Sequence, residues 1–177
     1  MNRFGIILAV VGIILATAIA SQQTHALDYF VTEEHKQRIA QNCVAAQATL
    51  YQLHASDALL RVNRGKLYEN ISTKLMAQLN SRIALNKHEG LKLSATTLEY
   101  DRQVDIFRSD YRLYEEAMTK TLDSKCADDP VAFYNDIQST REKRQRLHED
   151  TETLTALLNT YKTEFEDFST KLEGGAQ

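Results

Sequence analysis

The chain has 177 residues, with 21 Lys and Arg and 24 Asp and Glu, so its formal net charge is only −3 at pH 7. The length allows one domain with a modest core, and the interspersed charges argue against the one-signed field of a nucleic-acid-binding protein. Only one Pro and six Gly interrupt the chain, so long helices are expected.

The first predicted element is an apolar run over residues 4–20, which contains no charge and no Pro. It is at the short limit for a membrane span and slightly long for the core of a signal peptide. A small-x-small pattern at residues 24–26 favours cleavage before Leu27, and residues 18–20 offer a second cleavage site. Residues 1–26 are therefore interpreted as a signal peptide or, if uncleaved, as a signal anchor in the membrane.

Both interpretations place the remaining chain, residues 27–177, outside the cytoplasm, either secreted or in the cell envelope. Arg3 precedes the apolar run and the next basic residue is Lys36, so an uncleaved segment would keep its N-terminus inside. In an oxidising compartment the two cysteines, Cys43 and Cys126, are predicted to form an intramolecular disulfide. An intermolecular bridge and free thiols are the alternatives.

The next predicted element is a long helix over residues 32–87. Thr32 is placed at its N-cap, and Gly90 is expected to end it. Gly65 is a candidate position for a bend within this helix. Steps of four and three residues predict a coiled-coil-like seam formed by Ile39, Cys43, Ala46, Leu50, Leu53, Leu60, Leu67 and Ile71.

Two further helices are predicted over residues 96–124 and 130–173. Thr96 and Glu99 have the spacing of a capping box, and Asp129, which precedes the proline, is a strong helix start. The inner face of the earlier helix is predicted to comprise Tyr100, Val104, Phe107, Tyr111, Tyr114 and Met118. The predicted fold class is all-α: an elongated up-down-up three-helix bundle, coiled-coil-like, preceded by the N-terminal hydrophobic export segment.

The predicted disulfide constrains how these helices align, because its two Cα atoms must lie within about 7 Å. The first helix climbs about 63 Å from Cys43 to its end, whereas the second descends only about 46 Å to Cys126. Residues 86–94 are therefore expected to extend along the tip of the bundle. This alignment predicts charged layers that fix the register of the helices. The layers join Asp57 with Arg112, Arg141 and Arg144, and Arg64 with Asp105 and Asp150.

Neither a catalytic nor a metal site is predicted. His54 with Asp57, and His148 with Glu152, have helical spacing, but two such residues do not make a site, and the Glu-x-x-His of diiron bundles does not occur. The basic stretch at residues 141–146 is interpreted as a salt-bridged face, because acidic residues frame it. No enzymatic activity and no cofactor are therefore expected.

The predicted function is that of a non-enzymatic exported cell-envelope protein, a structural or protein-interaction module that docks a helical face onto a partner or self-associates. The candidate interaction face comprises Tyr161, Phe165, Phe168 and Leu172, with ordinary core positions as the alternative. A second hypothesis is an extracytoplasmic, sensor-type bundle that binds a small ligand in a pocket between helices, lined by Tyr100, Tyr111, Tyr114 and the charged layer. The membrane is a partner only if the N-terminal segment stays uncleaved.

Overall fold

The computed structural model describes residues 31–174, and the predicted export segment lies outside these residues. The elements are α1 (Glu33–Gln41), α2 (Cys43–Asn70), a π-helical turn η1 (Ile71–Met76), α3 (Ala77–Leu85), α4 (Leu91–Asp123) and α5 (Pro130–Gly174). No strand occurs in this described part of the chain, so the all-α fold class is confirmed. None of its helices combines the length and the apolar character needed to cross a membrane.

Two predicted helix starts are confirmed by their capping hydrogen bonds. The backbone N–H of His35 donates to Thr32 Oγ1 at 3.3 Å, which places Thr32 at the N-cap of α1. The backbone N–H of Ala132 donates to Asp129 Oδ1 at 3.0 Å, and Pro130 is the first residue of α5. Each side-chain oxygen satisfies one of the backbone donors that a helix leaves free in its first turn.

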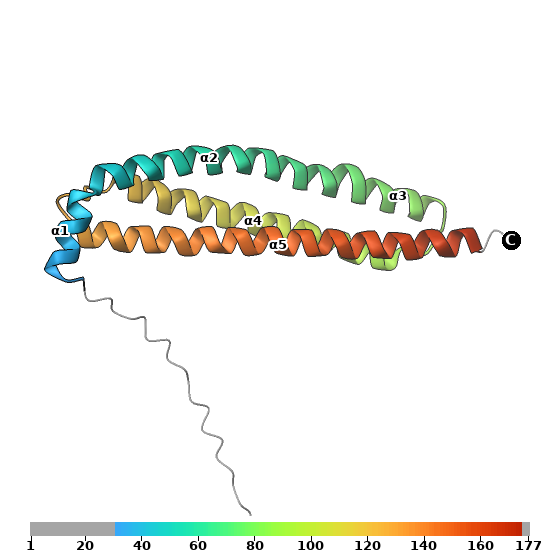
Figure 1. Cartoon of the computed structure of the whole chain (residues 1–177). Helices are drawn as coiled ribbons and strands as arrows, with labels where there is room; N and C mark the ends of the chain where they lie inside the picture. Colours follow the sequence, from blue (N-terminus) through green and yellow to red (C-terminus); the bar gives the residue numbers. More distant parts are fainter. Residues whose placement is uncertain (1–30, 175–177) are drawn as a thin grey trace, which may run out of the picture. The chain divides into compact units, whose positions relative to one another are not determined.

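The helix predicted over residues 32–87 is divided into α1, α2, η1 and α3. The chain changes direction between α1 and α2, at Asn42 (Figure 1). The Asn42 side chain donates to the carbonyl of Arg38 at 2.8 Å, and local bonds of this kind compete with the helical ladder. The change of direction is thus at Asn42, whereas Gly65 lies within α2.

The connection between α3 and α4 is a turn over residues 86–90, whereas the sequence predicts an extended segment as far as residue 94. Because α4 begins at Leu91, the predicted capping box at Thr96 is wrong. The Thr96 hydroxyl lies inside the helix and donates to Glu164 Oε2 of α5 at 2.7 Å. Five additional residues lengthen α4 by about 7 Å, which covers part of the difference in length between the two helical segments.

The sequence predicts that Gly90 ends the first long helix, but α3 ends earlier, at Leu85. Gly90 instead allows the backbone of the turn to lie close to Ile83 of α3. Lys87 is the residue in the left-handed conformation, with φ 58°, and the backbone N–H of His88 donates to the carbonyl of Ile83 at 3.0 Å. A Cβ added at Gly90 would lie 2.7 Å from Ile83 Cγ2. Glycine is therefore required for this contact.

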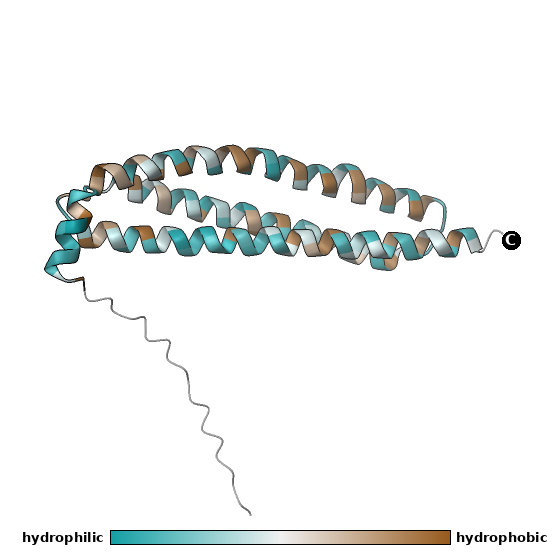
Figure 2. Cartoon of the chain, in the orientation of Figure 1, coloured by the Kyte–Doolittle hydropathy of each residue, from teal (hydrophilic) through white to brown (hydrophobic). Residues whose placement is uncertain are grey.

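Helix α4 contacts both of the other long helical segments. The α2–α3 segment and α5 run in one direction, and α4 runs in the opposite direction (Figure 1). Hydrophobic residues recur along α2 and α3, whereas the middle of α5 is strongly hydrophilic (Figure 2). The predicted inner face of α4 is buried over all six of its residues: Tyr100, Val104, Phe107, Tyr111, Tyr114 and Met118.

The α2–α3 segment and α5 do not approach each other as closely as each approaches α4. Cα atoms of α5 come within 8 Å of α4 and α1, but not of α2, η1 or α3. The backbones of these segments therefore stay apart along one side of α4, and only side chains bridge them. We call this side of the described part the open seam.

One end of α2 is fixed to the end of α4 by the predicted disulfide, which is confirmed. The Cα atoms of Cys43 and Cys126 are 5.6 Å apart, and both residues pack with the buried Phe133 of α5. The side-chain amide of Gln47 donates to the carbonyl of Ser124 at 2.8 Å, which ties α2 to the segment that follows α4. Covalent and polar contacts thus gather the three segments at this end.

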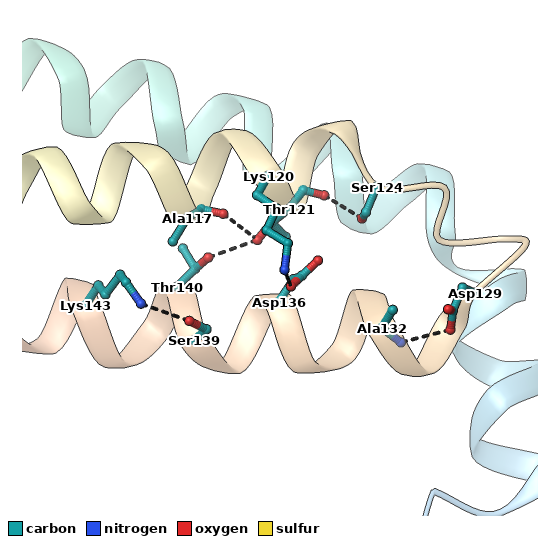
Figure 3. A network of polar contacts seen from close by, with 10 residues as sticks. All are labelled: Ala117, Lys120, Thr121, Ser124, Asp129, Ala132, Asp136, Ser139, Thr140 and Lys143. Carbon is teal, nitrogen blue, oxygen red and sulfur yellow. Dashed lines mark hydrogen bonds and ion pairs between the residues drawn. The ribbon is translucent and has the colours of Figure 1, made fainter.

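A polar network joins the last turns of α4 to α5 (Figure 3). The hydroxyl oxygens of Thr121 and Thr140 lie 2.9 Å apart and are buried. Lys120 Nζ lies 2.6 Å from Asp136 Oδ1 at the surface. Buried hydroxyl groups that bond each other satisfy their polar atoms and specify one alignment of the two helices.

Candidate functional site

The candidate site is a groove of about 570 Å³ on the open seam, lined by residues of α2, α4 and α5. Its charged lining consists of Asp57 and four arginines, and its other lining residues include His148, Leu60 and Phe107. We call it the arginine groove, after Arg61, Arg64, Arg141 and Arg144. Four guanidinium groups against one carboxylate give the lining an excess of positive charge.

Arg144 and Asp57 form the ion pair that crosses the groove from α5 to α2. Arg144 Nε donates to Asp57 Oδ2 at 2.8 Å and Nη2 donates to Oδ1 at 3.2 Å, and the hydroxyl of Tyr114 donates to Oδ2 at 2.6 Å. Burial alone would raise the pKa of Asp57, but the hydrogen bonds from Arg144 and Tyr114 outweigh it and hold the pKa below its ordinary value. Asp57 is therefore a carboxylate that neutralises one of the four arginines.

Arg61 is held against an aromatic ring at the same level. Its guanidinium carbon lies 4.5 Å from the centroid of the Tyr111 ring, a cation–π contact. The Tyr111 hydroxyl donates to Glu115, and the other oxygen of Glu115 lies 2.8 Å from His54 Nε2 on α2. Burial and the hydrogen bond to Glu115 raise the pKa of Tyr111, so its hydroxyl stays protonated. The contacts of Glu115 therefore fix the ring on which Arg61 rests.

The other two arginines keep their charges available to a ligand. Within residues 31–174, neither Arg64 nor Arg141 forms an ion pair, and Arg61 contacts a ring instead of a carboxylate. Guanidinium groups bind carboxylate and phosphate groups through two parallel hydrogen bonds. The arginine groove therefore has the chemistry of a site for an anion.

The structure brings together only part of the predicted charged layers. Asp57 meets Arg144, and Arg64 and Arg141 line the same groove. Arg112 lies at the surface, 3.5 Å from Glu116 on its own helix, and does not join the layer.

Asp105 is also a surface residue, with 75% of its side chain exposed, and its partner is Arg108 of the same helix at 3.1 Å. The register places residues at one height along neighbouring helices, but the rotation of each helix decides which of them face one another. Asp105 and Arg112 therefore lie on the surface of α4 and not on the face that the other helices cover.

The predicted interaction face is divided by the structure. Tyr161 is a core residue, 4% exposed, whose hydroxyl donates to Asn80 Oδ1 of α3 at 3.2 Å. Phe168 packs against the core, whereas Phe165 and Leu172 are partly exposed. Tyr161 is therefore an ordinary core residue, which was the alternative to an interaction face, and only part of the predicted face is exposed to solvent.

The tyrosines predicted to line a ligand pocket are also divided. Tyr111 and Tyr114 line the arginine groove, whereas Tyr100 is fully buried in the core beside α3 and α5 residues. Burial raises the pKa of Tyr100, so it is a neutral core residue.

The structure also shows a buried acid whose predicted partner is wrong. Asp150 is 7% exposed and accepts a hydrogen bond from Gln103 Nε2 at 2.9 Å, instead of pairing with Arg64. Its other oxygen, Oδ2, has no hydrogen-bond partner within the described residues. Burial, and secondarily the charge of Asp110, raise the pKa of Asp150. An aspartate in the apolar stripe of α5 is the only sequence signal for this feature.

Comparisons with known proteins identify no relative of this chain. No family model, no curated protein and no solved structure matches it. Within residues 31–174, no group of three or more His, Cys, Asp or Glu side chains could hold a metal ion. The arginine groove is thus the feature from which function is inferred.

Proposed function

We propose that the chain is a non-enzymatic exported protein of the cell envelope and acts as a protein-interaction module. In this proposal residues 27–177 form an elongated up-down-up three-helix bundle. The observation that carries the proposal is the arginine groove, where three arginines without a carboxylate partner lie beside the exposed side chain of Leu60. A surface of this composition fits an acidic partner that also buries apolar groups.

Export of the protein is supported by two independent features. The apolar run at residues 4–20 has the composition of a signal peptide or signal anchor, and structural disulfides persist in oxidising compartments. The mass of the exported protein under non-reducing and reducing conditions tests both features. We expect a mature chain that starts at Leu27 and is lighter by two hydrogens before reduction. A cytosolic, full-length chain with free thiols would contradict export.

The interaction is tested by chemical crosslinking in intact cell envelopes. We expect the wild-type chain to capture a stoichiometric partner, which includes a second copy of itself, and the double variant Arg64→Glu/Arg141→Glu to lose it. The matched control is Arg102→Glu/Arg112→Glu, which makes the same change in net charge on α4 outside the groove. Equal capture by both double variants, or no captured partner at all, would contradict the proposal.

A small anionic ligand is the second candidate, because the groove volume of about 570 Å³ lies in the range of small-molecule pockets and Tyr111 lines it. A panel of small carboxylates and phosphates, added to the purified protein, separates the two candidates. A rise in melting temperature that Arg64→Glu abolishes would favour the small ligand. An unchanged melting temperature across the panel would favour the partner protein.

A further inference from the structure

The open seam contains a second groove, of about 610 Å³, between the η1–α3 segment and α5. We call it the leucine groove. Its apolar lining includes Leu75, Leu79, Leu158 and Phe165, of which Leu75 is 52% exposed and Phe165 39%. Lys74, Arg82 and Lys162 complete its charged lining, which contains no acidic side chain. Exposed apolar groups framed by cations distinguish it from an ordinary surface depression.

The two grooves follow each other along the same pair of helical walls. Among the α5 residues that line the grooves, those at positions 141, 144, 148, 151, 158, 162 and 165 are separated by steps of three, four or seven residues. On the opposite wall the lining residues include two runs with steps of three and four, one at positions 57, 61 and 64 and the other at 75, 78 and 82, and the second run starts eleven positions after the first ends. Steps of three and four place side chains in one row, so each run forms part of a heptad row on its wall.

Core side chains fill the inner side of the seam, where Met76 and Ile83 pack with Leu154 and Tyr161 in one cluster, and the two grooves lie outside these contacts. Arg144 reaches Asp57 in the arginine groove, and Tyr161 reaches Asn80 beside the leucine groove. The backbones remain more than 8 Å apart at every Cα pair. Two heptad rows that face a common groove form the surface on which a further helix of a bundle packs.

The charges of the seam specify the flanks of such a helix. Seven Lys and Arg side chains line the two grooves, four in the arginine groove and three in the leucine groove, against the single carboxylate of Asp57. Lys162 lies 3.8 Å from the exposed Glu166, and Lys74 and Arg82 form no ion pair within the described part of the chain. A helix with acidic residues beside its apolar stripe would satisfy these charges, whereas a basic helix would be repelled.

We propose that the open seam is the docking site for an amphipathic helix of a partner protein, with an apolar stripe flanked by Asp or Glu. This inference rests on the proposed function and names the chemistry of the partner. The rows from Arg61 to Arg82 span about 32 Å, so the partner helix has about 21 residues. It lies along both grooves as a fourth helix. A single acyl chain would use only the leucine groove and leave the unpaired arginines unsatisfied.

The test uses the exported, oxidised protein and two synthetic helical peptides of about 21 residues. Both peptides carry Leu in a heptad stripe; one has Glu and the other Lys beside the stripe. We expect the Glu peptide to bind and the Lys peptide not to bind. Leu75→Asp should weaken binding at least about tenfold, whereas Leu98→Asp, the matched control at an exposed leucine of α4, should leave it unchanged. Circular dichroism checks that both variants stay folded.

Equal binding of the two peptides, or wild-type affinity in Leu75→Asp, would overturn the inference. Vesicles of phosphatidylcholine and phosphatidylglycerol form a further arm: binding to these vesicles that needs Leu75, without binding of the Glu peptide, would assign the seam to lipid and also overturn it. The envelope crosslinking distinguishes this failure from failure of the proposed function. A partner that Leu75→Asp still captures leaves the proposed function standing and contradicts the helix inference. The absence of any captured partner contradicts the proposed function itself.

Discussion

Reduction of the disulfide should lower the free energy of unfolding by about 4.5 kcal/mol. Cys43 and Cys126 are 83 residues apart. The chain-entropy model assigns about 15 cal/mol/K to closing a loop of this length, or about 4.5 kcal/mol at 25 °C. The stabilisation acts on the unfolded chain, so the helical content of the folded protein should stay the same after reduction.

The measurement is urea unfolding followed by circular dichroism at 222 nm, on the oxidised protein and on the reduced, unmodified protein. The double variant Cys43→Ala/Cys126→Ala should lose more than reduction does, because both cysteines are buried and their sulfur atoms leave contacts with Phe133. A loss below about 1 kcal/mol on reduction would refute the reasoning, because it would mean that the loop is already constrained in the unfolded chain or that the bridge is strained.

Three substitutions test local features of the fold. Gly65→Ala should raise the free energy of unfolding by about 1 kcal/mol, because a Cβ there meets no atom within 4 Å and alanine favours the helix. Gly90→Ala should lower it by about 1–3 kcal/mol, because the new Cβ would overlap Ile83; equal effects of the two glycine variants would contradict the packing argument. Asp150→Asn should raise it by about 1 kcal/mol at pH 7, since the hydrogen bond from Gln103 is kept and a buried charge with an unpaired oxygen is removed. The pKa of Asp150 is raised in the folded protein, so between about pH 4 and that pKa the folded protein binds more protons than the unfolded chain. The free energy of unfolding therefore falls as pH rises through this range. Asp150 lowers stability above the range and does not lower it below the range. An effect of Asp150→Asn that is the same at pH 3 and pH 7 in urea unfolding would exclude this explanation.

Local chemistry made some boundaries of the fold predictable. The oxygens of Thr32 and Asp129 cap helices through bonds within three residues, so their roles are visible in the sequence. The start of α4 is not, because Gly90 is selected by the closeness of Ile83, a contact that exists only after folding. Helical spacing likewise identified the buried face of α4 but could not reveal the π-helical turn η1 within the preceding segment.

The candidate site was only partly predictable for a similar reason. The expected alignment of the helices places Asp57 level with the arginines of α5, and the structure pairs it with Arg144. From the sequence, the basic stretch of α5 is interpreted as a salt-bridged face, because acidic residues frame it. In the structure, Arg141 lies in a groove and has no carboxylate partner within residues 31–174. The separation of α2 from α5 creates that groove, and this separation results from how both helices pack on α4 and not from the order of residues in either one.

The disulfide and the short turn connect the α2–α3 segment and α4 covalently at both ends, whereas α5 is connected at one end only. Cys43 and Cys126 close one end of the α2–α4 pair and residues 86–90 close the other, so these segments form a covalent ring. Helix α5 is joined covalently to that ring only at its start, Pro130, and along its length it is held by packing and hydrogen bonds. No residue of α5 after Tyr161 is buried, so in native-state hydrogen exchange the amides of its last turns should open at lower cost than those of α4. The leucine groove thus has one wall inside the covalent ring and the other on a helix that only packing and hydrogen bonds hold there.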